Sequence, residues 1–123
     1  MTMRFQDLDR FTPADVEAAI SRSDPEELPL VPLTLALLAD GPDLAETVCI
    51  RLARHEIPSV RGNAVVALGH LARRFRRLDE PQVRPLLEAA LQDPDATVRL
   101  LAKSAADEVH QFLHWTIAGH IYG

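Results

Sequence analysis

The sequence contains one cysteine, five scattered glycines and few aromatic residues. A lone cysteine, Cys49, excludes a disulfide within the chain, and glycines that do not cluster provide no glycine-rich phosphate loop. The longest apolar run, residues 28–39, is interrupted by Pro29, Pro32 and Thr34 and is too short to cross a membrane. No signal-like apolar segment opens the sequence, so we expect a cytoplasmic protein without membrane association.

The composition favours a helical protein. Hydrophobic residues make up 47% and charged residues 25% of the 123 residues, which is ordinary for a globular domain. Leucine, alanine, valine and acidic residues dominate, and this mixture suits the packing of helix on helix better than sheets. We therefore expect a single all-α domain over residues 1–123.

The net charge of −5 is unevenly distributed along the chain. Residues 1–50 hold 10 acidic and 3 basic residues, residues 51–78 hold 7 arginines and 1 acid, and residues 79–123 hold 7 acids and 3 bases. An acidic protein with one basic stripe is poorly suited to holding nucleic acid along its length. The pattern favours a protein partner that is basic or carries both charges.

Capping residues and apolar spacing divide the chain into helical segments. Thr12, Pro13 and Asp15 predict the start of a first helix, because Thr can cap free backbone N–H groups and Asp favours the positive end of the helix dipole. A second helix is expected to run to Ala39 and to bury Leu30, Leu33, Leu37 and Leu38. Further helices are expected over residues 44–55, 60–76 (with Ser59 as its cap), 83–92 and 97–117.

The last four of these segments repeat with a period of 38 residues. A shift of that length places Val60 and Arg61 on Val98 and Arg99. It also superimposes Ala64 on Ala102, Ala67 on Ala105, Leu71 on Val109, Phe75 on Leu113, Val48 on Leu86, and Cys49 on Leu87. The apolar positions coincide while the solvent positions differ, which is typical of repeats that share a core between stacked neighbours.

These residues resemble HEAT repeats, in which antiparallel helix pairs stack into a curved solenoid. Residues 91–105 match the family's pattern, as do residues 58–69, although His55 stands where the pattern has aspartate. The resemblance covers residues 43–116 and implies an all-α, short α-solenoid of about three antiparallel HEAT-like helix pairs. The pairs are expected at residues 12–40, where the pattern is degenerate, 43–77 and 81–117, followed by a tail at 118–123.

The resemblance also implies roles for particular side chains. Arg61 and Arg99 would form a ladder with turn aspartates of neighbouring repeats, the alternative being ligand binding by either arginine. Three pairs are the minimum for a stable solenoid, so its ends need covering. The acidic N-terminal segment and the aromatic tail, with Trp115 and Tyr122, are expected to cap them. Dimerisation through a solenoid end is the alternative.

Three polar residues near the C-terminus suggest a metal site. Asp107, His110 and His114 are spaced to share one face of the last expected helix, and with His120 as a fourth ligand they would suit zinc. The alternative is that they are partly exposed polar residues beside the aromatic cap. No known metalloenzyme motif is present in this stretch, and we predict no metal.

Other constellations also fall short of a catalytic site. His55 and Glu56 resemble one of the His-Glu pairs with which HEAT-like deoxyhypusine hydroxylases bind two irons, but a single pair supplies too few ligands. Cys49 lies on the packing face of its helix, as a small buried hydrophobe does. No nucleophile-elbow pattern accompanies the serines and histidines. We therefore expect neither enzyme activity nor a cofactor.

The basic run from Arg73 to Arg77 is the most pronounced charged feature. Phe75 is in register with the core, so the four arginines are expected to project around the end of their helix. There they would complement the helix dipole and pair with Asp79 and Glu80. The alternatives are a phosphate or nucleic-acid site, as on the basic concave face of HEAT-like DNA glycosylases, and a contact with an acidic patch of another protein.

The resemblance places a partner-binding face on the second helix of each pair, which lines the concave side of such solenoids. The candidate partner-binding residues are Asn63, His70, Arg73, Arg74, Leu101, Ser104, Glu108, Gln111, Phe112 and Trp115. Arginines and aromatic residues of this kind are enriched at protein-binding hot spots. The alternative for Trp115 is a place in the core or the cap.

The sequence therefore predicts a non-catalytic protein-binding module. Its size and acidity are similar to those of small bacterial immunity proteins of contact-dependent growth-inhibition or other polymorphic toxin systems. That resemblance implies that its carboxylates cover the basic cleft of a cognate nuclease toxin. The alternatives are a HEAT-repeat scaffold or a cofactor- or pigment-lyase-like protein in a larger complex, and a nucleic-acid binder that uses the stripe Arg73–Arg77.

Overall fold

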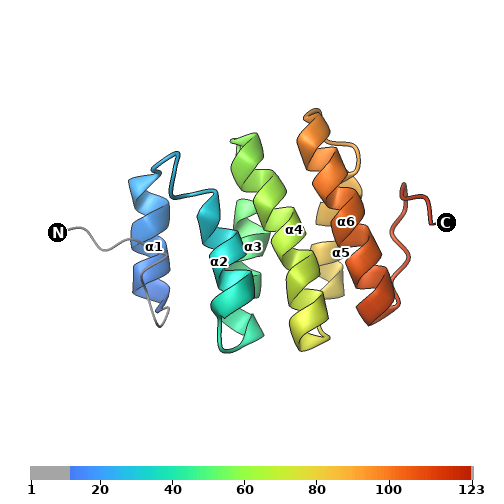
Figure 1. The fold of residues 1–123 in the computed structure, drawn as a ribbon, viewed down its shortest axis with the longest axis horizontal. Helices are drawn as coiled ribbons and strands as arrows, with labels where there is room; N and C mark the ends of the chain where they lie inside the picture. Colours follow the sequence, from blue (N-terminus) through green and yellow to red (C-terminus); the bar gives the residue numbers. More distant parts are fainter. Residues whose placement is uncertain (1–11, 123) are drawn as a thin grey trace.

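A computed structural model describes residues 12–122, and within them the protein is all-helical, with no strand. The helices are α1 (Pro13–Arg22), α2 (Leu30–Leu38), α3 (Pro42–Leu52), α4 (Pro58–Phe75), α5 (Glu80–Ala90) and α6 (Ala96–Leu113). Helices α2, α4 and α6 stand side by side in one layer, with α3 and α5 behind them and α1 beyond α2 (Figure 1). The predicted all-α class is confirmed. None of the described helices combines the length and apolar character needed to cross a bilayer.

Side-chain caps start α1 and α6, and a proline lies in the first turn of α1, α3, α4 and α5. The Thr12 hydroxyl accepts a hydrogen bond from the Asp15 N–H at 3.1 Å, and the Asp15 carboxylate accepts one from the Thr12 N–H, so the expected first helix start is confirmed. The expected cap at Ser59 is wrong, because α4 begins with Pro58, two residues before the expected start at residue 60, and Ile57 takes the cap position. In α2, Pro32 is the third residue, where a missing N–H costs no intrahelical bond.

Small residues bring α4 and α6 close together in the middle of the core. The expected buried stripes of both helices are present, and the four alanines Ala64, Ala67, Ala102 and Ala105 are fully buried. At Gly69 a side chain would begin only 3.0 Å from the Ala105 Cα and 3.2 Å from the Glu108 Cβ. The close approach of these two helices therefore depends on the absence of a Cβ at residue 69.

Helix α2 faces the core with residues other than those expected. Its buried positions are Val31, Pro32, Leu35 and Ala36. Of the four leucines predicted to be buried, Leu33 is partly buried, but Leu30, Leu37 and Leu38 are exposed. The expectation fails for those three because α2 is apolar on every side, so its spacing does not show which side turns inward.

The C-terminal helix is shorter than expected. Helix α6 ends at Leu113 rather than near residue 117, because His114 takes a left-handed conformation (φ 61°) and redirects the chain. The chain then folds back so that Trp115 and Ile117 are buried and the Tyr122 hydroxyl accepts a hydrogen bond from the Ile117 N–H. The aromatic tail thus covers this end of the helix stack, as predicted. The N-terminal segment expected to cap the other end lies outside the described residues, apart from Thr12.

Candidate functional site

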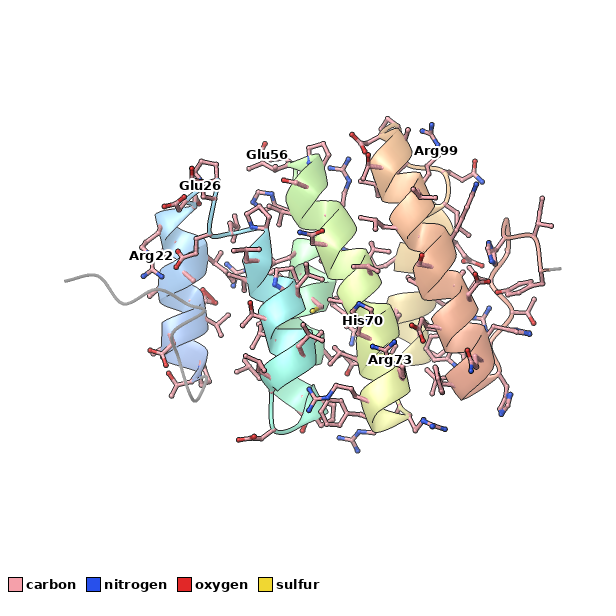
Figure 2. All side chains as sticks on the ribbon, in the orientation of Figure 1. Arg22, Glu26, Glu56, His70, Arg73 and Arg99 are labelled. Atoms are coloured by element: carbon pink, nitrogen blue, oxygen red, sulfur yellow. The ribbon has the colours of Figure 1, made fainter. Side chains whose placement is uncertain are left out.

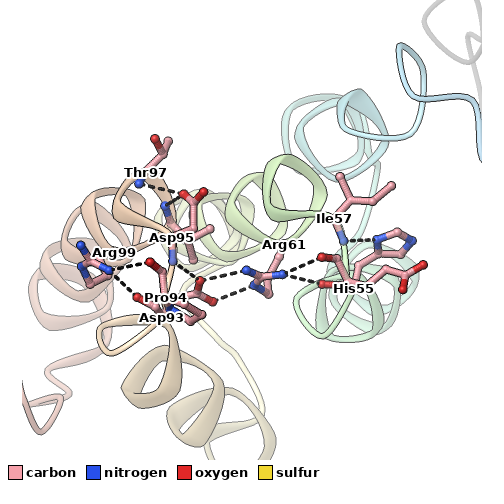
Figure 3. Close-up of polar contacts among 10 residues, drawn as sticks. His55, Ile57, Arg61, Asp93, Pro94, Asp95, Thr97 and Arg99 are labelled. Carbon is pink, nitrogen blue, oxygen red and sulfur yellow. Dashed lines mark hydrogen bonds and ion pairs between the residues drawn. The ribbon is translucent and has the colours of Figure 1, made fainter.

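An ion pair joins the turns at one edge of the molecule (Figure 3). Arg61 Nε and Nη2 donate to Oδ2 and Oδ1 of Asp93 at 2.7 and 2.9 Å, while Nη1 donates to the carbonyl oxygens of His55 and Glu56. Asp93 is only 8% exposed. Its hydrogen bonds with Arg61, helped by one from the Asp95 N–H, lower its pKa, although burial opposes the shift. Arg61 therefore clamps the turn before α4 to the turn before α6.

The two bonds to carbonyl oxygens recur 38 residues later. Arg99 Nη1 donates to the carbonyl oxygens of Asp93 at 2.6 Å and Pro94 at 3.0 Å. The expected bond to a turn aspartate of the neighbouring repeat is therefore present for Arg61, whereas Arg99 instead bonds to backbone carbonyl oxygens of the turn before its own helix. Helices α4 and α6 carry arginine as their fourth residue, whereas α2 carries Leu33, which packs on the core. Without an arginine there, nothing requires an aspartate at His55, which explains the departure from the repeat pattern.

The four arginines at the end of α4 all make contacts within the protein. Arg73 pairs with Glu108 (3.2 Å), and Arg77 pairs with Asp43 (2.9 Å). Arg74 donates to the Ala36 and Ala39 carbonyl oxygens (2.9 Å each). The Arg76 guanidinium lies 4.6 Å from the Phe112 ring centre. The expected pairing with Asp79 and Glu80 is wrong, since Glu80 instead pairs with Arg84 in its own helix. These arginines connect α4 to α2, α3 and α6.

Five of the ten candidate residues surround one hollow between α4 and α6, with a volume of about 460 Å³. They are Arg73, Ser104, Glu108, Gln111 and Phe112, and Asp107 joins them. Asp107 was expected only as a metal ligand; its side chain is 68% exposed here. The hollow thus presents two carboxylates, one arginine that is already paired, two neutral polar groups and an aromatic ring.

The other five candidate partner-binding residues do not line this hollow. The Asn63 amide donates to the carbonyl before α2 at 2.8 Å, and Arg74 holds the opposite end of α2. Leu101 packs into the space above Gly62, between α4 and α6. Trp115 is buried beneath an arginine of α5, in the place predicted by its alternative role as a capping residue. Asn63 and Arg74 therefore fasten α4 to α2, two of the helices expected to carry the partner-binding face.

His70 lies beside Arg73 on the outward side of α4 (Figure 2). Its Nδ1 is buried and, alone among the buried side-chain nitrogen and oxygen atoms of residues 12–122, has no hydrogen-bond partner. Burial lowers the pKa of His70 and the charge of Arg73 adds to the effect, while Glu108 opposes it. The ring is therefore neutral at pH 7, with one nitrogen still able to form a hydrogen bond.

The C-terminal histidines contact the tail. His120 Nε2 lies 2.7 Å from Asp107 Oδ1, and His110 Nδ1 donates to the Trp115 carbonyl oxygen at 3.0 Å. The expected shared helix face is wrong for His114, which lies beyond the end of α6. Nowhere in the described part of the chain do three or more His, Cys, Asp or Glu side chains gather in a way that would hold a metal ion.

Cys49 is fully buried among the core residues of α3. Its Sγ lies 3.9 Å from the Pro32 carbonyl oxygen. Burial is the main cause that raises the pKa of the Cys49 thiol above its ordinary value, and Glu46 adds to it. A protonated thiol without access to solvent is a poor nucleophile, so Cys49 packs as expected.

Among solved structures, a chain of a complex is similar to this protein. No protein-family model matches the chain, and neither does any curated protein. A chain in the "crystal structure of CDI complex from Cupriavidus taiwanensis LMG 19424" is similar, with a TM-score of 0.70 and 28% sequence identity. The similarity covers 90% of this chain and 98% of that one. This protein resembles a component of a CDI complex.

Proposed function

We propose that this chain is an immunity protein of a contact-dependent growth-inhibition system, which binds a cognate toxin and blocks it without any chemistry of its own. The observation that carries the proposal is the similarity to a chain of a CDI complex over 98% of that chain's length. The similarity also includes 90% of this chain, so it is not confined to a part of the helix stack. A role in binding a protein partner follows from it most directly.

Charge and chemistry favour the role of inhibitor over that of toxin. The chain has a net charge of −5, whereas a nuclease that acts on nucleic acid needs a basic surface for the phosphates. Arg61, Arg73 and Arg74 form ion pairs and hydrogen bonds within the protein, and Cys49 is buried and so is not placed to act as a nucleophile. The acidic chain is suited to a basic toxin, because opposite charges speed association and carboxylates can cover a cleft that binds phosphates.

The proposal is tested by expressing the toxin encoded directly beside this chain, with and without it, in a susceptible bacterium. We expect growth to stop with the toxin alone and to be restored by co-expression, and the two proteins to co-purify. A toxin from an unrelated system serves as the control and should remain toxic. Growth arrest caused by this chain alone would identify it as the toxin component, and a lack of protection against the neighbouring toxin would refute the proposal.

A further inference from the structure

Helix α2 exposes an apolar face that the fold does not need. Leu30 is 42% exposed, and Leu37 and Leu38 are each 56% exposed. With Thr34 they lie at positions i, i+4, i+7 and i+8, which places all four on one side of the helix. No charged residue interrupts α2. Contiguous exposed apolar surface is unusual on a monomer and marks sites of protein interaction.

This leucine face (Leu30, Thr34, Leu37 and Leu38) is held rigidly in place. Asn63 bonds to the carbonyl before α2, and Arg74 bonds to two carbonyls at its end, so α4 fastens both ends of the helix. Buried side chains fix the inner side of α2. A surface held in this way loses little conformational entropy when a partner binds.

The leucine face belongs to the same layer as the hollow between α4 and α6. Helices α2, α4 and α6 lie side by side, and His70 and Arg73 occupy the middle helix (Figures 1 and 2). Neighbouring helix axes are about 8–10 Å apart, so a partner that reaches from α2 to α6 spans about 20 Å. That width fits within an interface of standard size, about 800 Å² on each partner.

We propose that the outer face of this layer is the toxin-binding surface, and that the toxin sets apolar side chains against the leucine face and a lysine or arginine into the hollow. This inference rests on the proposed function. The charge of the hollow supports a basic side chain, because Asp107 and Glu108 supply two carboxylates against the single arginine, Arg73, which pairs with Glu108. His120 contacts one oxygen of Asp107, whose side chain is still 68% exposed. His70 and Arg73 of α4 lie between the two contacts, so all three helices of the layer contribute to the surface.

Substitutions at three exposed positions test the surface. Leu37→Asn removes apolar contact without adding charge, while Ser104→Lys and Ser104→Glu place opposite charges of similar size at the hollow. Ala89→Lys, on the exposed side of α5 in the other layer, is the matched control. The readouts are the affinity for the neighbouring toxin by titration calorimetry and the thermal midpoint of each variant alone.

We expect Leu37→Asn and Ser104→Lys to weaken toxin binding by about 30-fold or more, the size typical of hot-spot residues. Ser104→Glu and Ala89→Lys should stay within about threefold of the unaltered protein, since neither opposes a basic toxin side chain in the hollow. If the unaltered chain binds the toxin and all four variants bind equally well, the surface is wrong while the proposed function stands. Equal weakening by Ser104→Lys and Ser104→Glu would overturn the inference that a basic side chain of the toxin enters the hollow. A toxin that does not bind the unaltered chain overturns both proposals.

Discussion

At the scale of single residues, the Arg61–Asp93 pair has the clearest consequence for stability. Its carboxylate is buried and its pKa is lowered in the folded protein, mainly by the hydrogen bonds with Arg61. A lowered folded pKa contributes stability above the unfolded pKa of about 3.9, and this contribution disappears as the pH falls through the folded pKa. We expect Asp93→Asn to lower the free energy of unfolding at pH 7 by about 2 kcal/mol and to reduce the acid sensitivity of the protein.

Asp43→Asn is the matched control, because Asp43 also pairs with an arginine but its side chain is 89% exposed. Exposed ion pairs contribute about 0–1 kcal/mol, so this variant should unfold nearly as the unaltered protein does. Urea denaturation at pH 7 and at pH 3 measures both effects. Equal losses for the two variants at pH 7 would show that burial of the Arg61–Asp93 pair has no special role.

At the scale of the helices, Gly62 and Gly69 of α4 can be used to test how closely α4 and α6 must pack. A Cβ at residue 69 would lie 3.0 Å from the Ala105 Cα, a backbone atom that can move only with its helix. A Cβ at residue 62 would lie equally close to Leu101 Cδ1, the end of a flexible side chain. We expect Gly69→Ala to destabilise the protein by about 1–3 kcal/mol. Gly62→Ala should be nearly neutral, because the better helix propensity of alanine offsets the crowding by up to about 1 kcal/mol. Thermal denaturation compares them, and a Gly62 variant as unstable as the Gly69 variant would contradict this account.

The helices also show how far the sequence predicts the structure. The 38-residue repeat predicted the buried stripes of α4 and α6, and it placed Arg73 and Glu108 on one face, because both helices keep the same register against each other. It did not predict the roles of Asn63 and Arg74, whose partners lie on α2, where the repeat is degenerate. The end of α6 was missed because the apolar spacing continues through residue 117, and no glycine marks the turn at His114.

At the scale of the whole molecule, burial is concentrated at the centre of the stack. Helix α4 contributes nine buried residues and contacts α2, α3, α5 and α6, whereas α1 contributes two, Val16 and Ala19. The ion pair between Glu17 and Arg51 that ties α1 to α3 is exposed and adds little. The free energy of local opening should therefore fall from α4 towards α1.

Native-state hydrogen exchange measures this gradient directly. We expect the slowest amides of α4 to exchange only through global unfolding, and those of α1 through openings that cost at least about 2 kcal/mol less. The layer of α2, α4 and α6 that we propose binds the toxin does not include α1, so a bound toxin should slow exchange in α2 and leave α1 nearly unchanged. Equal protection of α1 and α4 in the free protein would mean that the stack opens as one unit, since local opening of α1 would then cost as much as unfolding the core.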